Sequence, residues 1–162
     1  MKKLIILVVV ALTGVINAQA QYRLGGGIAY GSDVEEFGLG VNGEFFLNSK
    51  VAVSPSLIVY FLENSDNVDR SFWELNTNVN YYFADEGALE VYALGGLNLA
   101  TSKFDRRGID NDDDSRTELG VNLGIGTNFD INSSIKPFAQ LKFVISDFDQ
   151  AVLFFGVRFS LK

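Results

Sequence analysis

Hydrophobic and polar residues alternate with a period of two along most of this chain. In ELGVNLGIGTNF (118–129), one set of alternate positions holds Leu, Val, Leu, Ile, Thr and Phe, and the other holds only Glu, Gly and Asn. This alternation predicts a β-strand with one apolar face and one polar face. The pattern recurs in segments of about ten residues, and it predicts eight strands, over 22–31, 37–46, 51–62, 72–83, 88–99, 118–129, 135–145 and 151–161.

The connections between these segments alternate in character. LNSK (47–50), ADEG (84–87) and DINSS (130–134) are short polar turns. The other connections, 32–36, 63–71, 100–117 and 146–150, are acidic, and two of them are long. An even number of strands with short turns at one end and longer loops at the other is the pattern of outer-membrane barrels, in which the short turns face the periplasm.

Glycine and asparagine dominate the polar face, and this composition favours a membrane barrel over a soluble one. A soluble barrel would cover its outer face with long polar side chains and would avoid glycine, which weakens strands. The narrow interior of an eight-stranded barrel is filled by its own side chains, so small residues suit it. We therefore expect the polar face inside, in an all-β, eight-stranded, antiparallel up-and-down transmembrane β-barrel.

The apolar face carries no charged residue within the predicted strands, and its aromatic residues gather near the strand ends. Two aromatic rims are typical of transmembrane barrels, where they lie at the two membrane interfaces. Near the short turns we find Tyr22, Phe45, Tyr81, Phe83, Phe129 and Phe159, and near the longer loops Tyr30, Phe37, Phe61, Trp73 and Phe143.

Charged residues of both signs occur on the polar face. A buried charge without a partner costs several kcal/mol, so we expect these charges to neutralise one another in a largely closed, polar lumen. Wide aqueous channels belong to barrels of about sixteen or more strands. The expected lumen charges are Arg23, Glu44, Glu74, Glu90, Glu118, Lys136, Lys142 and Arg158.

The N-terminal segment has the features of a secretory signal peptide. Lys2 and Lys3 precede an apolar stretch (4–12) that is too short to span a bilayer as a helix, and Ala18-Gln19-Ala20 forms a small-residue cleavage site. We expect a signal peptide over 1–20 and an outer-membrane β-barrel domain over 21–162. The chain has 13 basic residues, two of them in the signal peptide, against 20 acidic ones, which argues against nucleic acid as a partner.

The residue types also limit the possible chemistry. The chain has no histidine and no cysteine, so Ser-His and Cys-His activation of a nucleophile is excluded. We expect no enzymatic activity, no catalytic residue and no cofactor. Asp110, Asp112 and Asp114 have the opening spacing of a calcium loop, but Ser115 replaces the turn glycine and Val121 replaces the bidentate acid, so they are weak metal candidates only.

The signal end Ala18-Gln19-Ala20, the eight alternating segments and the last strand, AVLFFGVRFSLK, resemble the small eight-stranded outer-membrane barrels of Gram-negative bacteria. This is the group that includes the OmpA transmembrane domain and OmpX-like proteins. The resemblance implies a monomer in the outer membrane, surrounded by lipid and lipopolysaccharide, with a structural or surface-interaction role. The four longer loops carry thirteen acidic and five basic residues. They are the expected contact surface for a ligand or a host or cell-surface protein.

Two alternatives remain open at this stage. One is a narrow channel of the porin type, either passive or gated. The other is a secreted soluble barrel of lipocalin type that binds an apolar ligand, which would require the glycine and asparagine face to be outside.

Overall fold

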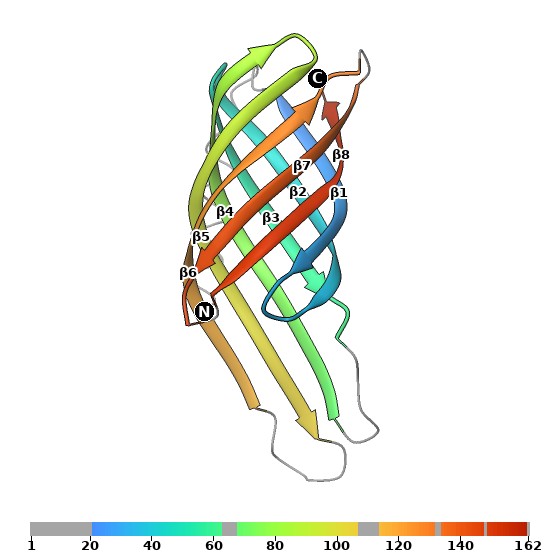
Figure 1. Cartoon of the computed structure of the whole chain (residues 1–162), viewed down its shortest axis with the longest axis vertical. Coiled ribbons are helices and arrows are strands. Elements are labelled where there is room, and N and C mark those ends of the chain that lie inside the picture. Colours follow the sequence, from blue (N-terminus) through green and yellow to red (C-terminus); the bar gives the residue numbers. More distant parts are fainter. Residues whose placement is uncertain (1–20, 63–67, 107–113, 132–133, 148, 162) are drawn as a thin grey trace.

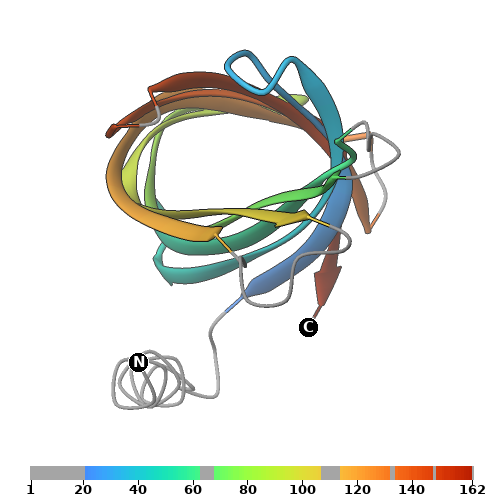
Figure 2. The same cartoon turned by 90° about the horizontal axis from the view of Figure 1, so that it is seen from below.

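Eight antiparallel strands form a closed barrel in the computed structural model, and β8 closes on β1 (Figures 1 and 2). The predicted all-β, eight-stranded antiparallel fold is thus confirmed. The structure describes residues 21–62, 68–106, 114–131, 134–147 and 149–161, so the expected signal peptide lies outside the described residues. The strands are β1 (Tyr22–Gly31), β2 (Glu36–Asn48), β3 (Val51–Tyr60), β4 (Val68–Glu86), β5 (Leu89–Arg106), β6 (Asp114–Phe129), β7 (Ile135–Ile145) and β8 (Gln150–Leu161).

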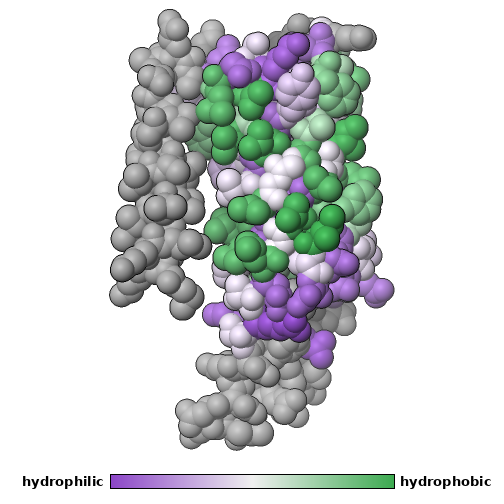
Figure 3. Space-filling view, turned by 90° about the vertical axis from the view of Figure 1, so that its left-hand side faces the viewer, coloured by the Kyte–Doolittle hydropathy of each residue, from purple (hydrophilic) through white to green (hydrophobic). Residues whose placement is uncertain are grey.

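The apolar set of alternate residues faces outward. In β6, Leu119, Val121 and Leu123 are exposed, whereas Asn122 between them is fully buried. Apolar side chains cover the middle of the barrel wall, and hydrophilic ones gather toward both ends (Figure 3). This is the surface of a barrel surrounded by lipid, and the soluble lipocalin-like alternative requires the opposite arrangement. No helix in the described part of the chain is long and apolar enough to cross a membrane.

The two ends of the barrel differ in their connections. At the turn end, uppermost in Figure 1, lie the start of β1, the end of β8, the turns 49–50 and 87–88, the end of β6 and the start of β7. At the loop end lie the turn 32–35, the end of β3 and the start of β4, the end of β5 and the start of β6, and the end of β7 and the start of β8. The predicted sorting of short turns and longer loops to opposite ends is therefore present in the fold.

Three strands extend further toward the loop end than the alternation predicts. β4 begins at Val68 instead of 72, β5 continues to Arg106 instead of 99, and β6 begins at Asp114 instead of 118. The expected loop 100–117 is therefore strand over all of its described residues. We call residues 68–71, 101–106 and 114–120 the projection, which extends beyond the rest of the barrel (Figure 1). Alternation fades in 68–71, 101–106 and 114–117, where charged and polar residues stand at both sets of alternate positions.

The interior is not uniformly polar, which corrects the expectation of a polar lumen. A barrel this narrow is packed like any protein core, so apolar side chains of the inward set can fill it as well as polar ones. Two apolar clusters lie in the interior. The smaller one, near the turn end, comprises Ala52, Tyr82, Tyr92 and Leu94, with Phe46 packed against it. The main cluster, here called the apolar stopper, lies toward the loop end and contains Ala29, Ile58, Tyr60, Phe72, Ala100, Phe138, Val144, Val152 and Phe154, with Val34 and Leu62 packed against it.

Glycine allows the backbones to approach closely where the barrel closes. Gly27 of β1 pairs with Gly40 of β2 and with Gly156 of β8, so three inward glycines lie side by side across the β1–β8 seam. A Cβ atom on Gly156 would lie 2.1 Å from the carbonyl oxygen of Gly26. A larger residue at position 156 therefore pushes β8 away from β1.

We expect Gly156→Ala to destabilise the barrel by about 1–3 kcal/mol because its methyl group overpacks the seam. The matched control is Gly95→Ala, since a Cβ atom on Gly95 has no neighbour closer than 3.8 Å. The measurement is the free energy of unfolding in urea, with folded protein identified by its faster migration on unheated gels. Equal stability of the two variants would contradict the close approach at the seam.

Candidate functional site

The barrel interior holds two clusters of charged side chains, and these are the candidate functional site. The cluster at the turn end gathers Arg23, Glu44, Glu90, Lys136 and Arg158. The second cluster, beside the apolar stopper, centres on Glu74 and Lys142. All seven of these side chains are buried, although they come from six different strands.

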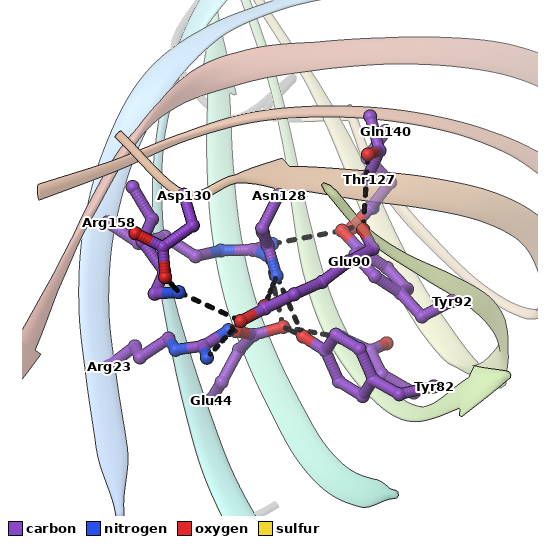
Figure 4. A network of polar contacts seen from close by, with 12 residues as sticks. Arg23, Glu44, Tyr82, Glu90, Tyr92, Thr127, Asn128, Asp130, Gln140 and Arg158 are labelled. Carbon is purple, nitrogen blue, oxygen red and sulfur yellow. Dashed lines mark hydrogen bonds and ion pairs between the residues drawn. The ribbon is translucent and has the colours of Figure 1, made fainter. Parts of the chain in front are cut away.

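Arg158 on β8 connects strands across the whole interior (Figure 4). Its guanidinium nitrogens donate to a Glu44 oxygen at 3.0 Å, to Asn128 Oδ1 at 2.5 Å and to the Tyr92 hydroxyl at 3.2 Å. The guanidinium carbon also lies 4.1 Å from the ring centre of Phe138, a cation–π distance. One fully buried side chain of the closing strand therefore binds β2, β5, β6 and β7.

Glu90 on β5 binds two cations at the turn end (Figure 4). The Arg23 guanidinium donates to both Glu90 oxygens, at 2.6 and 2.9 Å, which is the bidentate geometry of a strong ion pair. Lys136 Nζ donates to the same carboxylate at 2.8 Å and to Asp130 at 2.6 Å. Since Arg23 also lies 3.4 Å from Glu44, the ion pairs of this cluster form one continuous network.

Tyrosine and asparagine complete the hydrogen bonding of Glu44. The Tyr82 hydroxyl donates to Glu44 at 2.5 Å and Asn80 donates at 2.9 Å. The rings of Tyr82 and Tyr92 pack with centroids 5.0 Å apart, so the network also has an aromatic wall. Tyr82 and Tyr92 were not among the expected site residues. The sequence did indicate that their side chains point inward, because both belong to the polar set of alternate positions.

The second cluster has one ion pair with a shell of neutral donors. Lys142 Nζ donates to Glu74 at 2.6 Å, and the Tyr60 hydroxyl donates to the other Glu74 oxygen at 3.0 Å. Asn98 donates to Glu74 at 3.1 Å, and Gln150 also donates to it. Both charges are almost completely buried, and their hydrogen bonds offset the cost of removing them from water.

A set of asparagine side chains extends this second cluster across β4, β5 and β6. Asn76 accepts hydrogen bonds from Asn98 and Asn122, each at 2.8 Å, and from Lys142 at 2.7 Å. Asn122 also donates to Asn78 at 2.8 Å. Neutral amides therefore fill the space beside the ion pair, and their hydrogen bonds connect β4, β5 and β6.

Unlike the other seven expected lumen charges, Glu118 does not lie in the barrel interior. Its side chain lies on the projection, is 23% exposed, and accepts a hydrogen bond from Arg116 Nε at 2.6 Å. Arg116 also reaches Asp147 at 3.3 Å, which ties β6 to the connection between β7 and β8. Glu118 is therefore part of the loop-end surface, and it takes no part in the two interior clusters.

The weak metal candidates cannot be assembled into a site from the described residues. Asp110 and Asp112 lie outside them, and Asp114 is described only as the first backbone position of β6. Among the residues that the structure describes, no group of three or more acidic, histidine or cysteine side chains could hold a metal ion.

A closed barrel with an apolar outer belt and an interior of paired charges defines a small transmembrane β-barrel. The family model described as the outer membrane protein beta-barrel domain matches residues 5–149, and the chain belongs to this family. Membership in this family implies a place in the outer membrane of a Gram-negative bacterium. The predicted resemblance to small eight-stranded outer-membrane barrels is confirmed.

Solved structures with a similar fold come from several bacteria. Ail, the attachment invasion locus protein of Yersinia pestis, is 16% identical with a TM-score of 0.65, over 87% of this chain and 96% of Ail. The N-terminal β-barrel domain of Pseudomonas aeruginosa OprF is 17% identical with a TM-score of 0.64, over 88% and 97%. Neisserial surface protein A is 14% identical with a TM-score of 0.66, also over 88% and 97%. No curated protein sequence matches the chain significantly.

We expect Arg158→Met to destabilise the barrel by about 3–5 kcal/mol, because it leaves the buried Glu44 carboxylate without its nearest cation. The measurement is equilibrium unfolding in urea, followed by the fluorescence of Trp73, the single tryptophan. Glu44→Gln removes the other charge, so the double variant Glu44→Gln/Arg158→Met should lose less stability than the two single variants together. Additivity within about 0.5 kcal/mol would contradict the coupling of Glu44 to Arg158.

Proposed function

We propose that this protein is a closed, non-enzymatic outer-membrane barrel with a structural or surface-interaction role. In this proposal the segment 1–20 is a signal peptide removed on export, and 21–162 is the mature domain. The turn end faces the periplasm and the loop end faces outward, in keeping with the usual orientation of such barrels. The protein acts as a monomer surrounded by lipid and lipopolysaccharide.

The observation that carries the proposal is the filling of the interior along its length. The turn-end cluster, the asparagine side chains around Glu74 and Lys142, and the apolar stopper occupy successive parts of the lumen. Paired charges and packed apolar side chains leave little space for a water path. This packing supports a closed barrel over the alternative of a narrow channel.

The lack of histidine and cysteine in the sequence supports a non-enzymatic role. The buried carboxylates of Glu44, Glu74 and Glu90 are each held by a cation and by neutral donors. A carboxylate with all its oxygens engaged is poorly placed to act as a general base, which has to reach the proton that it removes.

The acidic loop end is the surface that we propose for contacts outside the cell. Ail has been solved in complex with sucrose octasulfate, a heparin analogue, and is 17% identical to this chain. The loops of this chain carry thirteen acidic and five basic residues, so their field repels such a polyanion. A partner of this protein should therefore carry positive charge.

We expect the purified barrel to show no steady conductance in planar lipid bilayers, because its lumen is filled. Folding of the same sample is checked by the mobility difference between unheated and boiled protein on gels. A reproducible open channel from correctly folded protein would contradict the closed barrel and favour the channel alternative.

A further inference from the structure

The ladder between β2 and β3 is broken at Pro55. Its register places Gly43 opposite Pro55, and this pair is missing. The next pair toward the turn end, Glu44 with Ser54, is missing as well. Proline has no N–H to donate to the Gly43 carbonyl, so the hydrogen bond that both pairs share cannot form. Proline in a sheet is normally confined to an edge strand or a bulge, and a closed barrel has no edge. Pro55 therefore marks a break in the wall.

The same seam is irregular a second time, closer to the turn. Its register shifts between Phe46 and Asn48. Among the described residues, every other ladder is continuous from its first pair to its last, except for one shift between Tyr82 and Ala84 on the β4–β5 seam. The β2–β3 ladder thus has two interruptions, and both lie toward the turn end.

The turn-end cluster of charged side chains does not hold this part of β3 in place. The donors to Glu44 come from β1, β4 and β8, and they are Arg23, Asn80, Tyr82 and Arg158. Within the described part of the chain, the side-chain hydrogen bond of β3 is that of Tyr60, which belongs to the second cluster. Between Val51 and Ser56, β3 is therefore held by its main-chain ladders and by the packing of Ala52.

An aromatic ring covers the break from the lipid side. Gly43 has no side chain, and a Cβ atom there would lie 3.0 Å from Cε2 of Phe45. Gly43 is buried, although it belongs to the outward set of alternate positions. A ring moves aside by a change of rotamer, without the loss of a hydrogen bond. The cover over the break is therefore easier to displace than a continuous ladder.

We propose that the turn-end half of β3 is a movable part of the wall, which parts reversibly from β2 and opens the barrel sideways toward the lipid. β3 stays paired with β4, because that ladder is continuous from Val51 to Tyr60. Parting uncovers Glu44 and Ser54, which are buried behind the seam. In a bilayer each peptide group depends on its partner in the protein, so the seam that lacks a hydrogen bond is the first to open.

The test is the hydrogen exchange of single amides, followed by NMR for the folded protein in phospholipid nanodiscs. The N–H groups of a strand alternate in direction, so Val53 donates to β2, whereas Ala52 and Ser54 donate to β4. We expect the protection factor of Val53 to be at least about tenfold lower than those of these two adjacent residues. Equal protection of the three amides would overturn the proposal.

A pair of proline variants tests the cause of the weak seam. Pro55→Ala supplies the missing donor and should raise the protection factor of Val53 to within about twofold of that of Ser54. The matched control is Pro137→Ala on β7, where the ladder with β8 runs through the proline, paired with Val157. This control should leave Val53 unchanged. The same change in both variants, or no change in Pro55→Ala, would overturn the role of Pro55.

A disulfide across the seam separates movement of the strand from a merely weak hydrogen bond. Phe46 pairs with Ala52 between the two strands. Cysteines at both positions, Phe46→Cys with Ala52→Cys, can form a disulfide at the short Cα distance of a non-hydrogen-bonded pair. We expect exchange at Val53 to be at least about tenfold slower in the oxidised form than in the reduced form of this variant.

The same exchange rate in both forms would contradict the movement of β3. The opening leads sideways into lipid and not along the barrel axis, so bilayer conductance tests the closed lumen separately.

Discussion

Every peptide group inside a bilayer has to find its hydrogen-bond partner within the protein, because hydrocarbon offers none. In this chain the requirement is met by pairing β8 with β1, so the wall has no open edge at the level of the lipid. Eight strands make a narrow cylinder, and its interior has to be filled by the inward side chains. The glycine row of Gly27, Gly40 and Gly156 and the buried ion pairs both follow from this limited space.

Closure and filling depend on each other through Arg158. This residue lies on the strand that closes the barrel, and its partners Glu44, Tyr92 and Asn128 come from strands across the lumen. Arg158 can pair with Glu44 only when β8 is in place, and β8 in turn gains the energy of that pair.

Alternation along the sequence was enough to predict the strand number, the lipid-facing side and seven of the interior charges. The pairing of those charges could not be predicted, since Glu44 and Arg158 are 114 positions apart and the register across a barrel is a property of its closure. The apolar stopper was missed because Ile58 and Tyr60 share the inward set with serine, so composition alone suggested a polar lumen. Most of the projection was missed because charged and polar residues stand at both sets of alternate positions in 68–71, 101–106 and 114–117.

The filling of the lumen is the central claim, and the absence of cysteine from the sequence allows a direct test of it. Ser54 is buried inside the barrel and Ser115 is exposed at the loop end, so a single cysteine at either position reports on access of water. The measurement is the rate at which a charged, water-soluble thiol reagent modifies each folded variant in lipid. A filled lumen predicts rapid modification of Ser115→Cys and almost none of Ser54→Cys. Comparable rates at the two positions would contradict the account.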